Sequence, residues 1–378
     1  MKYKINDIGQ IVCGGTPSTS VKEYWDNEIV WLTPKDLSIN KSKYTTQSSV
    51  MISQKGYQNS SAKLVPINTV LMSSRAPIGY LTIAKTELCT NQGFKAIICN
   101  EKIINHEFLY YLLQTKVEDL KTISTGSTFL ELSTNTFKNY EIEVPDLQEQ
   151  QHIVNILGSI DDKIENNEKM IKQFETLNRL YFHKNYILAD KKDWKIELLG
   201  NCVDITRGSS PRPIQDYLGN KGMPWVKISD ATENDSNYLT KTKEFIKEDG
   251  INLSKTVIPN TLIVSNSATP GLPKIMKITA CVHDGWLIFT NYKDLTKEFV
   301  KYVIDFNKKE LISSGNGSVF TNLKTEILKA LKIYLPPKNI LEQMNNYLKA
   351  NLDIQYKLEC NNIKLQELKQ LYLKKFFG

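Results

Sequence analysis

The chain has 378 residues, a length typical of two domains plus a further segment. Hydrophobic residues make up 41% of it and charged residues 24%, which is ordinary for a globular protein and excludes a disordered chain. No apolar run reaches the length of about 18 residues that a transmembrane helix needs, and the first residues lack the apolar segment of a secretion signal. The six cysteines show no Cys-x-x-Cys spacing. We therefore expect a cytoplasmic protein with reduced thiols.

The net charge is +7, from 48 basic and 41 acidic residues. This excess is compatible with a polyanionic partner, but it is too small to indicate one by itself. Only four of the basic residues are Arg, at positions 75, 179, 207 and 212. The few Arg residues are therefore more informative than the many Lys residues.

The predicted elements alternate between strands and helices. Apolar runs at 69–72 and 96–99, bounded by Gly, Asn and Ser, are typical of strands. The run at 108–113, which follows His106 and Glu107, indicates a helix. Residues 1–145 and 187–335 therefore predict mixed α and β domains with substantial loops.

Two long helices follow these domains. From 146 to about 186 the chain has no Pro and a single Gly, and its apolar residues predict one seam at Ile153, Leu157, Ile160, Ile164, Ile171, Phe174 and Leu177. Residues 338–377 repeat this composition. Each helix of about 40 residues would be roughly 60 Å long. Because a lone amphipathic helix cannot bury its seam, we expect the two to pair antiparallel. Asn167 either specifies the register of this pair or marks an exposed kink.

The second half of the chain repeats the first at an offset of about 191 to 194 residues. Matches run collinearly over about 140 residues, which indicates a tandem duplication. The matched pairs are Gly9 with Gly200, Pro17 with Pro211, Trp31 with Trp225, Asp36 with Asp230, Cys89 with Cys281, Gly93 with Gly285, and Pro145 with Pro336. The predicted fold is α+β, with domains at 1–145 and 187–335, helices at 146–186 and 336–378, and a pseudo-two-fold internal repeat.

Known catalytic motifs are absent from the sequence. It has no His-Glu-x-x-His zinc motif, no phosphate-binding Gly-x-x-x-x-Gly-Lys-Ser/Thr loop and no Gly-x-Ser-x-Gly nucleophile turn. It also lacks Asn-Pro-Pro-Tyr, which resembles the signature of amino-methyltransferases. We therefore predict a non-catalytic chain without a metal site or a cofactor of its own.

The start of the first long helix resembles one family in particular. The sequence PDLQEQQHIV at 145–154 resembles the Pro-Leu-x-Glu-Gln-x-x-Ile-Val start of the spacer helix in specificity subunits of type I restriction–modification systems. RAPIG at 75–79 and NQGF at 91–94 resemble loops of that family's target-recognition domain. The second copy departs from the pattern, with SATPG at 267–271, HDGW at 283–286 and only LEQ at 341–343. The resemblance in these loops is therefore carried by the first copy, as is expected if each domain reads its own half of a target.

The resemblance implies a function and a set of partners. Each globular domain would read half of a bipartite target in double-stranded DNA, and the helices would set the spacing and dock two methyltransferase subunits. S-adenosylmethionine would bind to those partners, and cleavage would require motor-nuclease subunits. The charge distribution agrees in direction, because the two domains carry +2 and +4, the central helix −2 and the last helix +3. The alternative is a coiled-coil scaffold whose paired domains bind protein or single-stranded nucleic acid.

The candidate DNA-binding residues all lie in predicted loops. Arg75 suits bidentate pairing with guanine, although a structural role in its loop is equally compatible. Basic loops that contain Gly approach phosphate readily, which suggests the loops around Arg207 and Arg212. Ser and Asn side chains can donate to bases or phosphates, or they can cap their own loops. The full set is Thr16, Ser73, Ser74, Arg75, Ser127, Arg207, Ser209, Arg212, Ser265, Asn266 and Asn316.

The candidate partner-binding residues lie at the start of each long helix. They are Gln150, Ile153, Ile160, Ile164, Glu342 and Gln343. We interpret the repeated Trp31 and Trp225 as core residues, and Cys89 and Cys281 as buried small hydrophobic residues.

Overall fold

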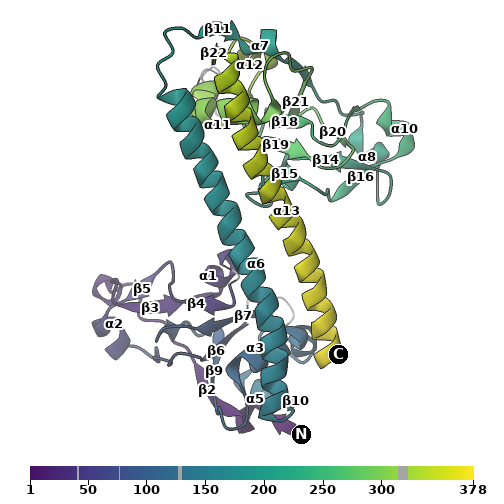
Figure 1. Cartoon of the computed structure of the whole chain (residues 1–378). Coiled ribbons are helices and arrows are strands. Elements are labelled where there is room, and N and C mark those ends of the chain that lie inside the picture. The colour runs from purple at the N-terminus through teal and green to yellow at the C-terminus, as the bar shows by residue number, and fades with distance from the viewer. Residues whose placement is uncertain (41, 76, 127–129, 314–321) are drawn as a thin grey trace. The chain divides into compact units, whose positions relative to one another are not determined.

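The computed structural model describes residues 1–40, 42–75, 77–126, 130–313 and 322–378. The chain folds as two compact units (Figure 1). Unit 1 comprises residues 1–166 and 362–378, and unit 2 comprises residues 167–361. Each long helix therefore contributes one part to each unit.

A five-stranded sheet is the centre of unit 1. Its order is β2-β9-β6-β7-β4, and all neighbours are antiparallel except β4 and β7. A three-stranded sheet β5-β3-β8 and a pair β1-β10 complete the β structure. The strands are β1 Lys2–Lys4, β2 Gly9–Cys13, β3 Ile29–Leu32, β4 Tyr44–Thr45, β5 Met51–Ile52, β6 Val70–Ser74, β7 Ile78–Ala84, β8 Cys89–Thr90, β9 Phe94–Cys99 and β10 Glu141–Glu143. The helices are η1 Ile5–Asp7, η2 Lys22–Tyr24, α1 Pro34–Ile39, α2 Gln54–Gln58, α3 His106–Thr115, α4 Val117–Thr122, α5 Thr134–Lys138 and the first part of α6 Leu147–Phe182.

Unit 2 has the same central sheet. Its order is β12-β21-β18-β19-β15, again antiparallel except for the last pair. A second five-stranded sheet, β13-β16-β14-β20-β17, and the pair β11-β22 accompany it. The strands are β11 Lys195–Leu198, β12 Asp204–Arg207, β13 Leu218–Gly219, β14 Met223–Val226, β15 Tyr238–Leu239, β16 Glu244–Ile246, β17 Lys255–Val257, β18 Leu262–Ser265, β19 Pro273–Met276, β20 Ala280–Val282, β21 Trp286–Thr290 and β22 Lys332–Leu335. The helices are the second part of α6, η3 His183–Ile187, α7 Leu199–Cys202, α8 Ile214–Tyr217, α9 Ile228–Thr232, α10 Glu248–Ile251, α11 Lys297–Ser313, α12 Thr325–Lys329 and the first part of α13 Lys338–Phe377, whose last part belongs to unit 1.

Both faces of each central sheet are buried, which explains its nearly continuous apolar strands. In β6, Val70 and Met72 face a core shared with α3 and α6, whereas Leu71 faces a second core with α1. In β18, Leu262 and Val264 face the core with α11, and Ile263 faces the opposite core. This two-residue alternation is what strand geometry requires. The predicted strands at 69–72 and 96–99 and the helix at 108–113 are confirmed by β6, β9 and α3.

The internal repeat is confirmed by the topology, although the predicted alignment is wrong at its start. The Ile5 amide donates to Tyr140 and the Leu199 amide donates to Leu331, so the offset there is 194 residues and Gly200 does not match Gly9. The predicted core residues Trp31 and Trp225, at 7% and 2% exposure, and Cys89 and Cys281, at 0%, are all buried. The duplication therefore preserves the core together with the order of the strands.

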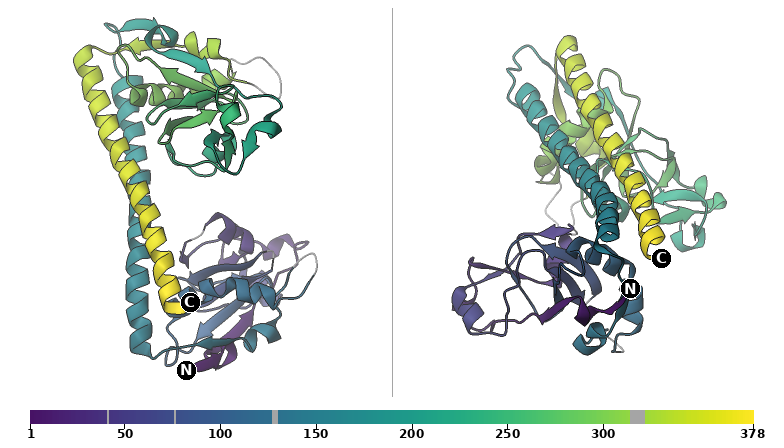
Figure 2. Two further views of the ribbon diagram at one scale, coloured as in Figure 1. Left: turned by 90° about the vertical axis from the view of Figure 1, so that its right-hand side faces the viewer. Right: turned by 60° about the horizontal axis from the view of Figure 1, so that its bottom comes forward.

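The two long helices pair antiparallel within each unit, as predicted (Figure 2). In unit 1, Lys369 Nζ lies 2.7 Å from Asp161 Oδ1. In unit 2, Asn351 Nδ2 donates to Asn178 Oδ1 at 2.8 Å. A second contact in each unit, from Asn362 Nδ2 to the Ile164 carbonyl at 3.5 Å in unit 1 and between the stacked rings of Tyr181 and Tyr347 in unit 2, shows that residue numbers rise along one helix as they fall along the other.

The predicted seam of α6 is wrong at Leu177. Leu177 is 47% exposed, and Asn178 is fully buried in its place. Spacings of four and three residues alternate from Ile153 onward, and continuing them past Ile171 and Phe174 leads to position 178. The seam therefore includes a buried amide where the sequence pattern favoured a leucine. The helix continues through Asn167, which is partly exposed.

Candidate nucleic-acid interface

Three loops of unit 1 meet beside the central sheet. The loop after β2 is tied to β8 by the Gly15 amide, which donates to Thr90 at 2.9 Å. The β6–β7 turn is tied to the loop before β9 by the Ser74 amide, which donates to Gly93 at 2.7 Å. The Thr16 hydroxyl donates to the Gln92 side chain. The backbone thus brings together three segments that are far apart in the sequence.

Unit 2 joins the equivalent three loops with equivalent bonds. The Ser209 amide donates to Val282 at 3.2 Å, and the Asn266 amide donates to Gly285 at 2.8 Å. The Ser210 hydroxyl donates to Asp284 Oδ1 at 2.8 Å, in the place of the bond between Thr16 and Gln92 in unit 1. We call these two sets of loops the loop clusters of units 1 and 2. They comprise 13–18, 73–75, 77–79 and 90–94 in unit 1, and 207–213, 265–271 and 282–286 in unit 2.

The buried serines predicted to contact DNA hold the β-turns of these clusters. Ser73 Oγ donates to the Pro77 carbonyl at 2.7 Å and accepts from the Tyr80 amide at 2.8 Å. In unit 2, Ser265 Oγ bonds to the Thr269 carbonyl and accepts from the Leu272 amide at 3.0 Å. Both serines are fully buried. Their hydroxyl groups are therefore used in hydrogen bonds within their own loops. This is the alternative role stated in the sequence analysis, in which Ser and Asn side chains cap their loops.

Two further predicted residues are also buried. Ser74 is fully buried, and its hydroxyl donates to the Gly93 carbonyl at 3.2 Å. Asn266 is 4% exposed, and its Nδ2 donates to the Asp284 carbonyl at 3.0 Å. Each side chain therefore ties its turn to the neighbouring loop. Ser127 and Asn316 lie outside the described residues.

Arg75 lies on the outside of the unit 1 cluster. Its Nη1 is 3.8 Å from Glu131 Oε1, and the two side chains are 37% and 50% exposed. The Arg75 backbone also forms a β-bridge with Glu131. A Cβ placed on Gly93 would lie 3.7 Å from Arg75 Cγ, so the Arg75 side chain passes close over the loop that contains Gln92. An exposed ion pair of this kind contributes only about 0–1 kcal/mol, which leaves the guanidinium available to a ligand.

The unit 2 cluster contains two arginines and one carboxylate. Arg212 Nη2 is 3.3 Å and Arg207 Nη2 is 3.7 Å from Asp284 Oδ2. Arg207 Nε also donates to the Asp284 carbonyl at 2.7 Å. The arginine side chains are 57% and 70% exposed for Arg207 and Arg212 respectively. The cluster therefore presents two guanidinium groups that share a single carboxylate.

The protonation states of this cluster follow from its contacts. Burial opposes ionisation of Asp284, but the Ser210 hydroxyl and the Arg212 guanidinium outweigh it and lower the pKa of this carboxyl. Burial lowers the pKa of His283, so its imidazole is neutral at pH 7. The neutral Nδ1 accepts a hydrogen bond from the Gly285 amide at 2.6 Å. The arginines and Asp284 therefore leave this group with a net charge of +1.

Thr16 and Ser209, the remaining predicted loop residues, are partly exposed. The hydroxyl of Thr16 is used by Gln92, and Ser209 Oγ donates to the Leu253 carbonyl at 3.2 Å. The sequence reasoning missed Gln92, Glu131 and Asp284. The sequence did contain a signal for Gln92 and Asp284. NQGF at 91–94 aligns with HDGW at 283–286 in the internal repeat, so these two residues occupy equivalent positions.

The predicted partner-binding residues divide into buried and exposed groups. Gln150 is fully buried, and its side chain bonds to the Ile103 and Pro145 carbonyls and the Asn105 amide. Ile153 and Ile160 are 4% and 5% exposed, and Ile164 is partly buried. Glu342 and Gln343, by contrast, are exposed at the start of α13. The first group attaches α6 to unit 1, and only the last two side chains lie open.

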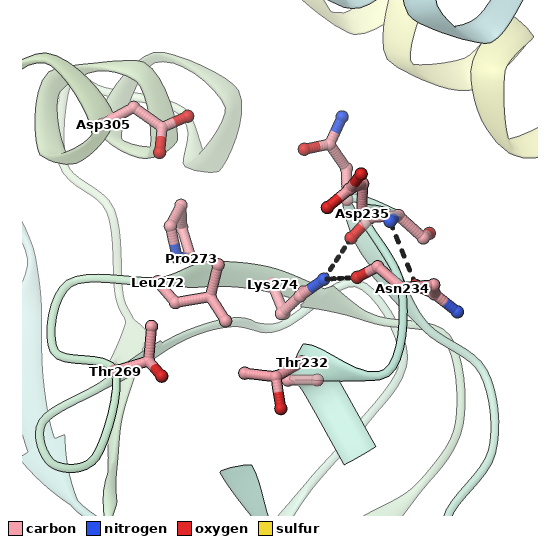
Figure 3. Close-up of a pocket in the computed structure, with 11 residues that line it drawn as sticks. Thr232, Asn234, Asp235, Thr269, Leu272, Pro273, Lys274 and Asp305 are labelled. Carbon is pink, nitrogen blue, oxygen red and sulfur yellow. Dashed lines mark hydrogen bonds between the residues drawn. The ribbon is translucent and has the colours of Figure 1, made fainter. Parts of the chain in front are cut away.

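A small cavity occurs at the equivalent place in each unit. In unit 2 it measures about 270 Å³ and lies between α9, β19 and α11 (Figure 3). It is lined by Ala231, Thr232, Asn234, Asp235, Ser236, Asn237, Thr269, Leu272, Pro273, Lys274 and Asp305. In unit 1 it measures about 230 Å³ and is lined by Leu37, Gly79, Tyr80, Leu81, Tyr110, Gln114 and Val117. By residue type, the lining is mostly polar or charged in unit 2 and mostly apolar or aromatic in unit 1.

Lys274 is the buried cation of the unit 2 cavity. It is 2% exposed, and its Nζ donates to the carbonyls of Ser236 and Asn234, the latter at 3.3 Å (Figure 3). Burial lowers the pKa of this ammonium to about 8. The unit 1 counterpart is Thr82, which is buried and uncharged.

The described residues include no group of three His, Cys, Asp or Glu side chains placed to hold a metal ion. Within the same ranges, no helix combines the length and the apolar character needed to cross a membrane.

Comparison with known proteins identifies the family. The model described as Type I restriction modification DNA specificity domain matches residues 1–176 and again 191–370. The type I restriction enzyme MjaIX specificity subunit of Methanocaldococcus jannaschii is 33% identical over 370 residues, covering 91% of this chain and 84% of that protein. The EcoR124I/EcoR124II specificity subunit of Escherichia coli is 30% identical over 168 residues, covering 42% of this chain and 40% of that protein. The crystal structure of the type I restriction–modification S subunit from M. genitalium has the same fold, with a TM-score of 0.64, 16% identity and coverage of 100% of this chain and 96% of that one. The chain therefore belongs to the type I restriction–modification DNA specificity family.

Proposed function

We propose that this chain is the non-catalytic subunit that gives a type I restriction–modification complex its DNA sequence specificity. Each unit would read one half of a bipartite target in double-stranded DNA. The observation that carries this proposal is the repeated loop cluster, which has the same backbone bonds in both units and different exposed side chains. One scaffold with two sets of side chains is suited to two different half-sites, because bases are distinguished by side-chain contacts.

The arginines are the leading candidates for DNA contact. Guanidinium groups pair with guanine and with phosphate, and the three at positions 75, 207 and 212 are each more than one-third exposed. The partly exposed Thr16 and Ser209 would supply secondary contacts. The buried Ser73, Ser74, Ser265 and Asn266 would shape the loops that carry these groups.

The paired helices would fix the separation of the two units and dock two methyltransferase subunits. Successive major-groove faces on one side of B-DNA are about 34 Å apart, so two readers require a fixed spacer. Glu342 and Gln343 would face a partner directly, whereas Gln150, Ile153, Ile160 and Ile164 would support the start of α6. S-adenosylmethionine would bind to the methyltransferases, and motor-nuclease subunits would be needed for cleavage.

Co-expression with the cognate methyltransferase tests this function. We expect genome-wide mapping to show a new bipartite adenine-methylation motif only when both proteins are present. Each protein expressed alone is the control. A soluble, associated pair that methylates no bipartite motif would contradict the proposal, and so would failure of the two proteins to associate.

A further inference from the structure

Asp284 faces both arginines of the unit 2 loop cluster, and its side chain is 40% exposed. Its Oδ1 accepts from Ser210 at 2.8 Å, and its Oδ2 faces both Arg207 and Arg212. The Ser210 hydroxyl also accepts from the Asp284 amide at 3.3 Å. The contacts with Ser210, which lies in the loop after β12, therefore hold the carboxylate in place independently of the two arginines.

The two arginines reach this carboxylate from one segment. Arg207 ends β12, and Arg212 lies five residues later in the same loop. The carboxylate holds each of them through one Nη atom at 3.3–3.7 Å, and Arg207 Nε is used by the Asp284 carbonyl. A guanidinium carries five N–H donors, so each group keeps donors that these contacts leave unused.

Two guanidinium groups that converge on one oxygen form the arrangement that binds a phosphodiester. Arginine is favoured at such sites because its planar fork matches the oxygens of phosphate. Exposed ion pairs contribute only about 0–1 kcal/mol, so Asp284 cannot compete strongly with a DNA phosphate for the arginines. A carboxylate in this position brings like charges together and directs both side chains to one point.

Unit 1 lacks this arrangement although its loops are equivalent. The positions that correspond to Arg207 and Arg212 are Cys13 and Ser18, and Gln92 takes the place of Asp284. Its one arginine, Arg75, lies on the β6–β7 turn and pairs with Glu131. The two clusters therefore present different chemistry on the same backbone.

We propose that Arg207 and Arg212 form a single phosphodiester contact site of unit 2, and that Asp284 is the positioning residue of that site. The proposal rests on the function proposed above and adds the kind of DNA group that this site contacts. Phosphate contacts fix the position of a protein on the duplex and carry no sequence information. The site therefore sets the affinity and the register of unit 2, while other residues of the unit read bases.

The salt dependence of DNA binding tests this assignment in the complex with the methyltransferase. Binding to a target duplex and to an unrelated duplex is measured over a series of salt concentrations for Arg207→Ala, Arg212→Ala and Arg212→Lys. Because the two arginines share one phosphate, each Ala variant should remove a part of the slope of about 0.9 in log K against log salt that one phosphate contact contributes. Each Ala variant should weaken binding to both duplexes by the same factor and leave the methylated motif unchanged. Arg212→Lys should keep the slope, because Lys also contacts phosphate as a point charge.

Asp284→Asn tests the positioning role. Asn retains an acceptor for Ser210 and removes the charge that faces the arginines. If Asp284 positions the two arginines on one phosphate, the slope of log K against log salt should fall as it does in the arginine variants, and the melting temperature should stay unchanged. A purely structural role for Asp284 would weaken both duplexes and lower the melting temperature instead. Asp190→Asn, which removes the charge of an exposed carboxylate paired with Lys192 outside the cluster, is the matched charge control.

Three results would overturn the proposal. A changed half-motif in an arginine variant would make that arginine a base reader, and an unchanged salt slope would remove it from the DNA contact. An unchanged salt slope in Asp284→Asn would remove the positioning role. Failure of the function itself is distinguishable, because the wild-type complex would then methylate no bipartite motif.

Discussion

The loop clusters of units 1 and 2 have the same backbone and different charges. Their tying bonds are equivalent, from the Ser74 and Asn266 amides to the side-chain bonds of Thr16 and Ser210. Unit 1 has one arginine balanced by one carboxylate, whereas unit 2 has two arginines around a single carboxylate. Because buried bonds hold the loops, exposed side chains can change without loss of the fold. This separation allows one duplicated domain to acquire two binding specificities.

The junction between each domain and the long helices shows the same contrast. In unit 1 the Tyr111 hydroxyl donates to Asp161 at 2.7 Å, and Lys369 completes the group. In unit 2 the Tyr302 hydroxyl donates to Glu175 at 3.0 Å, and Lys301 Nζ lies 3.6 Å from Glu175 and 3.0 Å from Asp305. A tyrosine–carboxylate bond thus joins domain to helix twice, and unit 2 adds a buried lysine.

The largest expected effect comes from removing that lysine. Lys301 is 1% exposed, and Lys301→Met would remove the buried cation of Glu175 and leave Asp305 with Arg179, whose Nη1 lies 3.8 Å away. Loss of one partner of a buried ion pair typically costs about 3–5 kcal/mol. We expect unit 2 to lose this much unfolding free energy in urea denaturation, with hydrogen exchange used to assign the loss to unit 2.

The equivalent position in unit 1 provides the control. Tyr110 stands where unit 2 has Lys301, and Tyr110→Phe removes one hydroxyl without unpairing a charge. Its expected cost is about 1 kcal/mol. Equal losses for the two variants would show that the buried lysine contributes nothing specific to unit 2.

The second prediction concerns the pH dependence of stability that Lys274, the buried lysine of the unit 2 cavity, gives to unit 2. Burial lowers the pKa of Lys274 to about 8, below that of the unfolded chain, so the folded state disfavours its charge. The resulting destabilisation is fully present below pH 8 and disappears as the pH rises to about 10.5, because the unfolded state binds more protons in that interval. We expect the free energy of unfolding to rise by on the order of 3 kcal/mol between pH 8 and pH 10.5.

Lys274→Met isolates this contribution from other groups that titrate in the same range. The difference in unfolding free energy between wild type and Lys274→Met should change with pH between 8 and 10.5. The exposed Lys192→Met should show no such change. A constant difference for Lys274→Met over this range would mean that the pKa of Lys274 is not lowered.

The sequence predicted the repeated framework because that framework depends on local patterns. Strands and helices follow from two-residue and three-to-four-residue periodicity, and collinear Trp, Pro and Gly residues mark the duplication. Asn178 was missed because a three-residue and a four-residue step from Phe174 are equally helical, and only packing selects one. Asp284 was missed as a partner of Arg207 because the two are 77 residues apart. They meet only because β12 pairs with β21, which no local pattern reveals.

The third and smallest expected effect separates the two arginine arrangements. Arg75 has no second arginine beside it and lies over the Gln92 loop, where a bidentate contact to guanine is compatible with Glu131, its ion-pair partner among the described residues. Arg75→Ala should weaken target binding by about 1–3 kcal/mol and relax one position in one half of the methylated motif. Methylation mapping of the variant complex measures this directly, with Arg212→Ala as the matched loss of one arginine from unit 2. If Arg75 contacts phosphate instead, the motif stays intact and only the salt slope falls, so the two units would then differ in charge but not in the kind of contact their arginines make.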